Sequence, residues 1–209
     1  TAENILGYIR SLPTKDMRSP MGLALSVSEQ VISLLKESCP DLRHIDVVGS
    51  LRRRKETIRD ITVIGSDPNP REVIQSFVNL PLVRDGVIEG SARANITTHS
   101  GLKVHLRMTD ENIYGAVVQH FTGSREHNML LRALAKEKGF WLNDRGVTSL
   151  KTGNTSIFAD EMALYSYLDL QFIPPELREG THEIDLASSH TLPDLVNLGQ
   201  IRGDLHCHT

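Results

Sequence analysis

The residues of this sequence that could carry chemistry begin with an acid on a candidate strand. Asp60 opens the stretch DITVIGS, and Thr62 stands at the next alternate position. Alternate residues of a strand point to the same face of a sheet, so these two side chains should lie together. A strand that builds a site for two divalent cations is expected to carry acids at both positions. Here a hydroxyl stands in the second position, and the pattern alone leaves open whether such a site still works.

A second candidate site comes just before that strand. Gly49 and Ser50 follow the apolar run HIDVV, and a glycine at such a turn lets backbone N–H groups approach an anion. A basic run follows, made of Arg52, Arg53, Arg54, Lys55 and Arg59. Guanidinium groups suit phosphate oxygens. This pattern is as typical of a cradle for a triphosphate or a nucleic-acid backbone as of a solvated basic loop.

The elements that must position these residues follow from hydrophobic spacing. The stretches LSVSEQVISLLKESC, REVIQSFVNL, NIYGAVVQHFTGS, REHNMLLRALAKEKG and DEMALYSYLDL are predicted helices, and Asp160 is expected to cap the last of them. Strands are predicted at HIDVV, DITVI, VRDGVIEGS and ARANITTHSGLKVHLRMT, with a small β region over 141–158. A polar connector is expected from IPPELREG to about Gln200. We predict an α+β fold, with a mixed twisted sheet, packed helices and a smaller α/β C-terminal subdomain.

Composition narrows the class of protein. The 209 residues carry a formal net charge of −3, so the chain as a whole is not a polyanion binder and any nucleic-acid surface must be local. The two cysteines, Cys39 and Cys207, lie far apart, which fits a reducing cytoplasm better than a disulfide framework. No apolar run approaches the roughly 20 residues needed to span a bilayer, so no membrane partner is expected.

Four stretches resemble the family X DNA polymerases. GSLRRRKETIRDITVI is similar to the signature of their nucleotidyltransferase palm, and HFTGSREHNMLLRALAKEKGFWLND to their Tyr-Phe-Thr-Gly-Ser segment and the following helix. FIPPELRE resembles their linker, and IRGDLHCHT the first motif of a PHP phosphoesterase domain. This order is that of bacterial and archaeal PolX-type proteins of DNA repair type, in which a PHP domain follows the polymerase core.

The resemblance implies a domain organisation. Residues 1–16 would end an upstream helical region, 17–110 would form the palm, 111–175 the C-terminal polymerase subdomain, and 176–209 the linker and first PHP motif. We expect the chain to be a piece of a longer protein that carries a helix-hairpin-helix region before it and the rest of a PHP domain after it. DNA and those two domains are the implied partners.

Family members hold magnesium or manganese with three aspartates. Asp60 matches the first, whereas Thr62 and His105 occupy the positions of the other two, and Arg59 replaces a usual glycine. A threonine hydroxyl is a weak neutral ligand, and imidazole suits zinc, copper or nickel better than magnesium. Three acids lie nearby without recreating the same-face pair, namely Asp46, Glu56 and Asp67. We therefore predict that the palm is degenerate and does not catalyse ordinary magnesium-dependent nucleotidyl transfer.

Other family positions are matched more closely. The triphosphate-binding positions correspond to Gly49, Ser50 and Arg53, the sugar-contacting positions to His120 and Phe121, with Gly123 ending that segment, and the base-pair contacts to Asn128 and Arg132. The family's tyrosine is lost at position 120. Metal normally neutralises much of the triphosphate charge, so binding of a deoxynucleotide is expected to be weak or lost.

The last motif carries His206 and His208, two imidazoles at alternate positions. The resemblance makes them ligands of a manganese, zinc or iron cluster in an intact PHP domain, whose other ligands would lie further along the longer protein. No cofactor is expected in this chain by itself. Three functions stay open: a DNA-binding or positioning platform for the PHP phosphoesterase, an active polymerase with altered ligands, and a structural inter-domain module.

Overall fold

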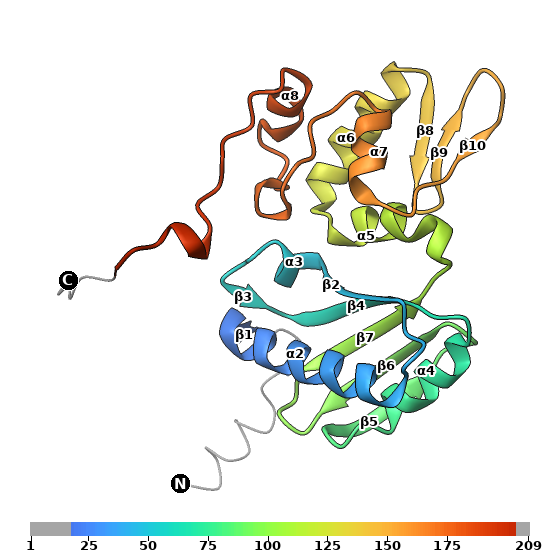
Figure 1. Cartoon of the computed structure of the whole chain (residues 1–209), viewed down its shortest axis with the longest axis vertical. Coiled ribbons are helices and arrows are strands. Elements are labelled where there is room, and N and C mark those ends of the chain that lie inside the picture. The colour runs from blue at the N-terminus through green and yellow to red at the C-terminus, as the bar shows by residue number, and fades with distance from the viewer. Residues whose placement is uncertain (1–17, 204–209) are drawn as a thin grey trace, which may run out of the picture.

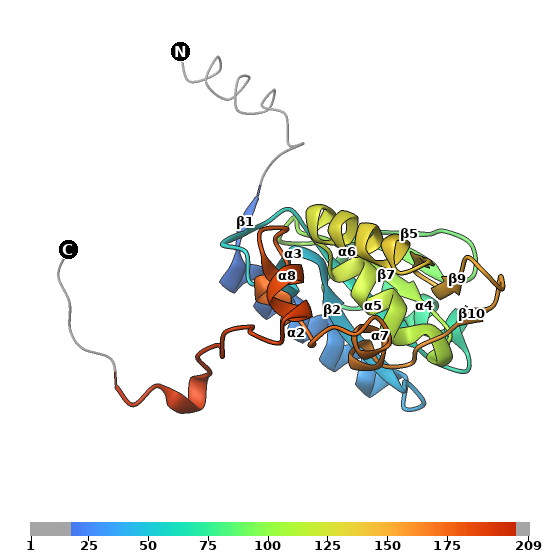
Figure 2. The ribbon, with the colours of Figure 1, turned by 90° about the horizontal axis from the view of Figure 1, so that it is seen from above.

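The computed structural model of the chain describes residues 18–203. Expectations for residues 1–16, His206 and His208 lie outside the described residues. Figure 1 shows a broad sheet with helices α2 and α4 on one side of it, and a second group of elements, α5 to α8 with strands β8 to β10, above the opposite side. Each group has its own hydrophobic core. Figure 2 shows residues 189–203 leading away from both groups.

The broad sheet has five strands in the order β2-β4-β7-β6-β5. Their bounds are β2 His44–Val48, β4 Asp60–Ser66, β5 Val83–Ile88, β6 Arg93–Thr98 and β7 Lys103–Met108. The central pair, β4 and β7, is parallel, and the other neighbours are antiparallel. Because parallel strands need a crossover, the chain passes from β4 through helix α4 (Pro70–Val78) and the β5–β6 hairpin before β7 completes the pair.

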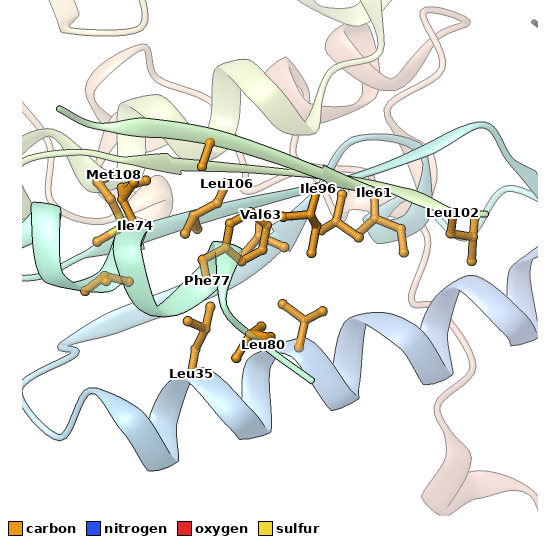
Figure 3. Close-up of a cluster of buried hydrophobic side chains, with 14 of the residues drawn as sticks. Leu35, Ile61, Val63, Ile74, Phe77, Leu80, Ile96, Leu102, Leu106 and Met108 are labelled. Atoms are coloured by element: carbon orange, nitrogen blue, oxygen red, sulfur yellow. The ribbon is translucent and has the colours of Figure 1, made fainter. Parts of the chain in front are cut away.

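One face of the sheet is packed against α4 and the 18-residue helix α2 (Met21–Ser38). Alternation along β4 and β7 sends Ile61, Val63 and Leu106 into this core, where they meet Phe77 of α4 and Leu35 of α2 (Figure 3). All five side chains are almost completely buried. Full burial of one such side chain stabilises the fold by about 1.5–3 kcal/mol, so this layer holds the strands in register.

The opposite face of the sheet carries polar and charged side chains. The same alternation places there Asp60 and Thr62 of β4, Arg93 and Asn95 of β6, and Lys103, His105 and Arg107 of β7. Helix α5 (Tyr114–Thr122) covers the β2 end of this face through Tyr114, Val117 and Val118. The candidate site therefore lies on the face that α2 and α4 leave free.

The C-terminal group is built from α5, α6 (Arg125–Glu137), β8 (Phe140–Asn143), β9 (Gly146–Ser149), β10 (Thr155–Ser156), α7 (Glu161–Tyr167) and α8 (Glu183–Ser188). Capping side chains begin two of its helices, as Ser124 accepts a hydrogen bond from the His127 amide and Asp160 from the Ala163 amide. The predicted cap at Asp160 is confirmed. The predicted α+β fold, a mixed sheet with packed helices, is confirmed as well.

Short elements complete the described residues: β1 Ser19–Pro20, α3 Gly49–Arg52, β3 Thr57–Ile58, and the 3₁₀ turns η2 Glu111–Ile113, η3 Pro175–Leu177 and η4 Leu198–Gln200. The connector predicted from IPPELREG to about Gln200 differs from the structure, because α8 interrupts it. Ile184 and Ala187 bury themselves in the C-terminal core, and two apolar residues are too few to mark a helix in the sequence. No helix within residues 18–203 has the length and hydropathy to cross a bilayer.

Candidate functional site

A row of polar side chains crosses the free face of the sheet at its centre. Thr62 of β4 is directly opposite His105 of β7, and His105 is directly opposite Asn95 of β6. Asp60 precedes Thr62 by two residues on β4, so it shares the same face, and it is opposite Lys103. The three positions that the family resemblance assigns to metal ligands thus lie together, and they present one carboxylate, one hydroxyl and one imidazole.

The carboxylate of Asp60 already has a cation beside it. The Arg59 Nε atom lies 3.0 Å from Asp60 Oδ2, and both side chains are partly exposed. An exposed pair of this kind contributes little to stability. A divalent cation at this carboxylate would have to compete with the positive charge of Arg59.

The imidazole of His105 is held by its neighbour. His105 Nδ1 lies 2.6 Å from Asn95 Oδ1, and an amide oxygen can only accept, so Nδ1 carries the proton. The unprotonated Nε2 is the nitrogen left to accept a hydrogen bond or bind a soft metal. Magnesium prefers oxygen ligands in near-octahedral geometry, so this nitrogen is a poor replacement for a carboxylate.

Asp46 does not fill the place of a lost carboxylate. It shares the free face but lies on β2 opposite Ile64, one row away from Thr62. The Tyr114 hydroxyl donates a hydrogen bond of 2.8 Å to Asp46 Oδ2, which ties the carboxylate to helix α5. Burial, with the charge of Asp46 adding to it, raises the pKa of Tyr114, so this hydroxyl keeps its proton. Within residues 18–203, no three His, Cys, Asp or Glu side chains converge to hold a metal.

The backbone of the predicted anion cradle has a conformation that suits anion binding. Its arginine, however, is already bound to other residues of the chain. Gly49 opens α3 at a φ of +69°, a conformation that favours glycine, and Ser50 follows it half-buried. The side chain of Arg53 is only 12% exposed, and its Nε lies 3.0 Å from Glu179 Oε1. A second guanidinium nitrogen donates to the Thr122 carbonyl. Arg53 therefore holds the connector against α3 with the atoms that would bind phosphate.

Arg52 is also used inside the chain. Its guanidinium donates 2.6 Å to Thr122 Oγ1 and 2.7 Å to Glu161 Oε2. The other oxygen of Glu161 accepts from Arg178, which is completely buried. This network joins α3 to the end of α5, the start of α7 and the connector. Arg52 and Arg53 therefore join parts of the chain to each other and are not free to meet a ligand.

The segment from His120 to Gly123 touches the cradle from the other side. Gly123 ends α5 at a φ of +64°, and a side chain placed there would come within 3.4 Å of Arg53 Nη1. At Gly49, a side chain would come within 3.8 Å of the Phe121 carbonyl oxygen. Arg52 and Arg53, which follow the Gly-Ser pair, thus contact Thr122 about 70 residues further along the chain.

Side chains predicted for sugar and base-pair contacts gather beyond this segment. Asn128 accepts 2.9 Å from Gln119 and donates 2.8 Å to the His120 carbonyl, so part of its amide is engaged. Arg132 Nη2 lies 3.2 Å from His120 Nδ1, and the His120 ring packs against Phe121 at 5.0 Å between centroids. Burial lowers the pKa of His120, and Arg132 lowers it further, so the imidazole is neutral at neutral pH.

A protein family and a known protein are similar to this chain. Residues 117–179 match the family described as DNA polymerase beta thumb. Over 212 aligned residues the chain is 32% identical to DNA polymerase/3'-5' exonuclease PolX of Bacillus subtilis (strain 168), in a match that covers 99% of this chain. Both matches support a family X DNA polymerase-like protein. It spans 36% of the length of that curated relative.

The mixed sheet with packed helices is consistent with a polymerase beta-like nucleotidyltransferase fold. Such a fold implies a pair of magnesium or manganese ions, and the residues of this family X DNA polymerase-like chain do not fit that pair. Two divalent cations need several shared carboxylates. Here Asp60 is the one acid in the row with Thr62 and His105, and Arg59 already neutralises it.

Sequence reasoning missed several residues of the site. Arg107 lies over the Phe121 ring at 4.8 Å, and its Nη2 is 3.3 Å from Asp144 Oδ2. The sequence does indicate this residue, because it follows His105 by two positions on β7 and alternation puts both side chains on one face of the sheet. Glu179 and Asn95 gave no such signal, because their roles depend on partners that only the fold brings near.

Proposed function

We propose that the chain is part of a family X DNA polymerase-like protein whose palm does not catalyse ordinary magnesium-dependent nucleotidyl transfer. It serves instead to bind or position DNA for a PHP phosphoesterase domain of the longer protein. The observation that carries the proposal is the group formed by Asp60, Thr62 and His105. It offers one carboxylate where the chemistry needs three. Two nearby acids are already engaged, since Asp46 accepts a hydrogen bond from Tyr114 and Glu89 accepts one of 2.6 Å from Asn95. Within residues 18–203, no three His, Cys, Asp or Glu side chains converge there.

The obstacle to nucleotidyl transfer is the shortage of negative charge around the metal pair. Nucleotidyl transfer places two cations about 3.5–4 Å apart, and their mutual repulsion is offset by shared carboxylates and phosphate oxygens. A hydroxyl and an imidazole bring no negative charge, and Arg59 adds a positive one beside Asp60. Arg53, ion-paired with Glu179, is also withdrawn from a triphosphate. Both changes lower the affinity for a metal–nucleotide complex, so deoxynucleotide binding is weak or lost.

The DNA-binding part of the proposal rests on local charge. The free face of the sheet carries Arg93, Lys103 and Arg107, and Arg132 lies near Arg107 beside His120. Arg93 and Arg107 are directly opposite each other on neighbouring strands. Asp144 lies 3.3 Å from Arg107 and offsets part of this repulsion, whereas Arg93 has no ion pair within residues 18–203 and is free to meet an anion. Phosphate groups of DNA are such anions, although the whole chain has a net charge of −3.

The domain assignment belongs to the same proposal. Residues 17–110 would be the palm, 111–175 the C-terminal polymerase subdomain, and 176–209 the linker and first PHP motif, with His206 and His208 as PHP ligands in the longer protein. The name of the B. subtilis relative pairs polymerase with 3'-5' exonuclease, which supports a hydrolytic activity beside a polymerase core.

Primer extension tests the proposal. The chain is incubated with a gapped primer–template and deoxynucleotides, first with magnesium and then with manganese. We expect no incorporation above that of an Asp60→Asn control. Incorporation at rates ordinary for enzymes, about 1 s⁻¹ or faster, that disappears in the Asp60→Asn variant would show an active polymerase with altered ligands.

A further inference from the structure

A groove on the C-terminal group lies apart from the Asp60, Thr62 and His105 site and from the anion cradle. It has a volume of about 320 Å³ and runs between helix α6 and the edge strand β8. One wall is a single face of α6, where Met129, Arg132 and Lys136 follow one another at helical spacing. The other wall is Trp141 with Phe140 of β8.

The groove exposes large apolar side chains that the fold does not use. Trp141 and Met129 are each 58% exposed, although tryptophan and methionine side chains are on average well buried. Trp141 alternates with buried Leu142, so the strand itself directs the indole outward. An aromatic face held open on a rigid strand and helix is a platform for a flat ligand.

The charges around the groove indicate what kind of ligand this is. Among residues 18–203, neither Arg132 nor Lys136 forms an ion pair with an acid. Two cations beside an aromatic ring match a strand of nucleic acid, whose phosphates are anionic and whose bases are flat. A purely apolar partner would leave both cations buried without a counter-charge, which is costly.

We propose that this groove binds an unpaired nucleotide of single-stranded DNA, with its base stacked on Trp141 and its flanking phosphates paired with Arg132 and Lys136. This rests on the proposed function. Arg132 connects the groove to the segment predicted to contact the sugar, because it lines the groove and its guanidinium also lies 3.2 Å from His120. A duplex on the free face would thus reach the groove with its unpaired tail. The bases of an intact duplex are stacked on each other and offer no free face to Trp141.

Trp141 itself reports on this binding, because it is the single tryptophan of the 209 residues. Its emission is titrated with a tailed duplex, with the same duplex carrying an abasic tail, and with the blunt duplex, while the anisotropy of labelled DNA gives the overall affinity. We expect the tailed duplex to quench the emission strongly. The abasic and blunt forms should bind with little quenching.

Variants separate stacking from charge. Trp141→Ala should weaken binding of the tailed duplex about five- to a hundredfold, as expected for one lost base stack, and leave the blunt duplex unchanged. Lys136→Ala should reduce the salt slope of single-strand binding by about 0.7. Met162→Ala is the matched control, since Met162 is equally exposed on α7 and lies outside the groove. All three positions are on the surface, and circular dichroism checks that each variant folds.

The outcomes distinguish this inference from the proposed function. Salt-dependent binding of both duplexes without a change in Trp141 emission overturns the inference and leaves the DNA platform intact. Quenching by the single-stranded tail alone, with no binding of the blunt duplex, supports the groove and contradicts a duplex platform. Emission that changes with chain concentration in the absence of DNA identifies the groove as a self-association surface, which also overturns the inference.

Discussion

Arg53 and Glu179 form the contact that most restricts what the anion cradle can bind. The two residues are 126 positions apart, and Arg53 Nε lies 3.0 Å from Glu179 Oε1. Lys55 Nζ lies 3.4 Å from the other oxygen, so one carboxylate occupies two cations of the basic run. A triphosphate entering the cradle would have to displace Glu179 before it could reach Arg53.

Neutralising that carboxylate should open the cradle. We expect Glu179→Gln to bind inorganic triphosphate about three- to tenfold more tightly than the unaltered chain, because a partly exposed ion pair of modest strength no longer competes. Isothermal titration calorimetry measures the change. Glu176→Gln is the matched control, since Glu176 is exposed in the same segment and makes no ion pair within residues 18–203. Equal affinities for the two variants would show that Glu179 does not guard Arg53.

Single residues also mark how far the sequence could predict the site. Alternation correctly placed Asp60 and Thr62 on one side of the sheet, because period-two spacing is a local property of strands. His105 lies on another strand, and only the family resemblance assigned it to the same site. The basic run does not form an anion cradle in which every arginine is available to a ligand. Which of the arginines face solvent is decided by Glu161 and Glu179, far along the chain, and no local pattern records that choice.

At the scale of elements, α8 docks through a buried polar network. Glu183 accepts 2.8 Å from His127 Nδ1 on α6, and the Tyr165 hydroxyl of α7 lies 2.9 Å from His127 Nε2. Burial alone would raise the pKa of Glu183, but the hydrogen bonds from His127 and the Gly180 amide outweigh it and lower the pKa to about 2. Burial lowers the pKa of His127, so a neutral imidazole joins a carboxylate to a hydroxyl.

This network predicts acid sensitivity. A carboxyl whose pKa falls from 4.5 to about 2 on folding stabilises the fold fully above pH 4.5 and loses that contribution as the pH drops towards 2. The contribution is about 3 kcal/mol. His127, with its pKa also lowered, adds destabilisation below about pH 6.5 for the same reason.

Chemical denaturation between pH 3 and 8 checks this. We expect Glu183→Gln to be less stable than the unaltered chain at pH 7 by roughly 2–3 kcal/mol, with the difference shrinking towards pH 3. Asp185→Asn on the exposed side of α8 should change little at any pH. A Glu183→Gln difference that stays constant with pH would mean that the ionised carboxylate is not what holds α8.

At the scale of the whole molecule, the two faces of the sheet differ in what covers them. The cations of the free face lie opposite the layer formed by α2 and α4 (Figure 1), so DNA binding should involve one side only. We expect Lys103→Ala to lower the salt slope of duplex binding by about 1, the value for one lost phosphate contact. Lys36→Ala, the same change on α2, should leave the slope unaltered. Affinity that does not vary with salt would favour a structural inter-domain module.

The central claim is that one carboxylate does not hold a pair of divalent cations. The most direct measurement counts the manganese ions bound, by electron paramagnetic resonance, in the presence of primer–template DNA and a non-hydrolysable deoxynucleotide. For the unaltered chain we predict no bound ion that depends on Asp60, and for Thr62→Asp/His105→Asp we predict new manganese binding that Asp60→Asn removes. Two manganese ions on the unaltered chain that both leave on Asp60→Asn would contradict the account.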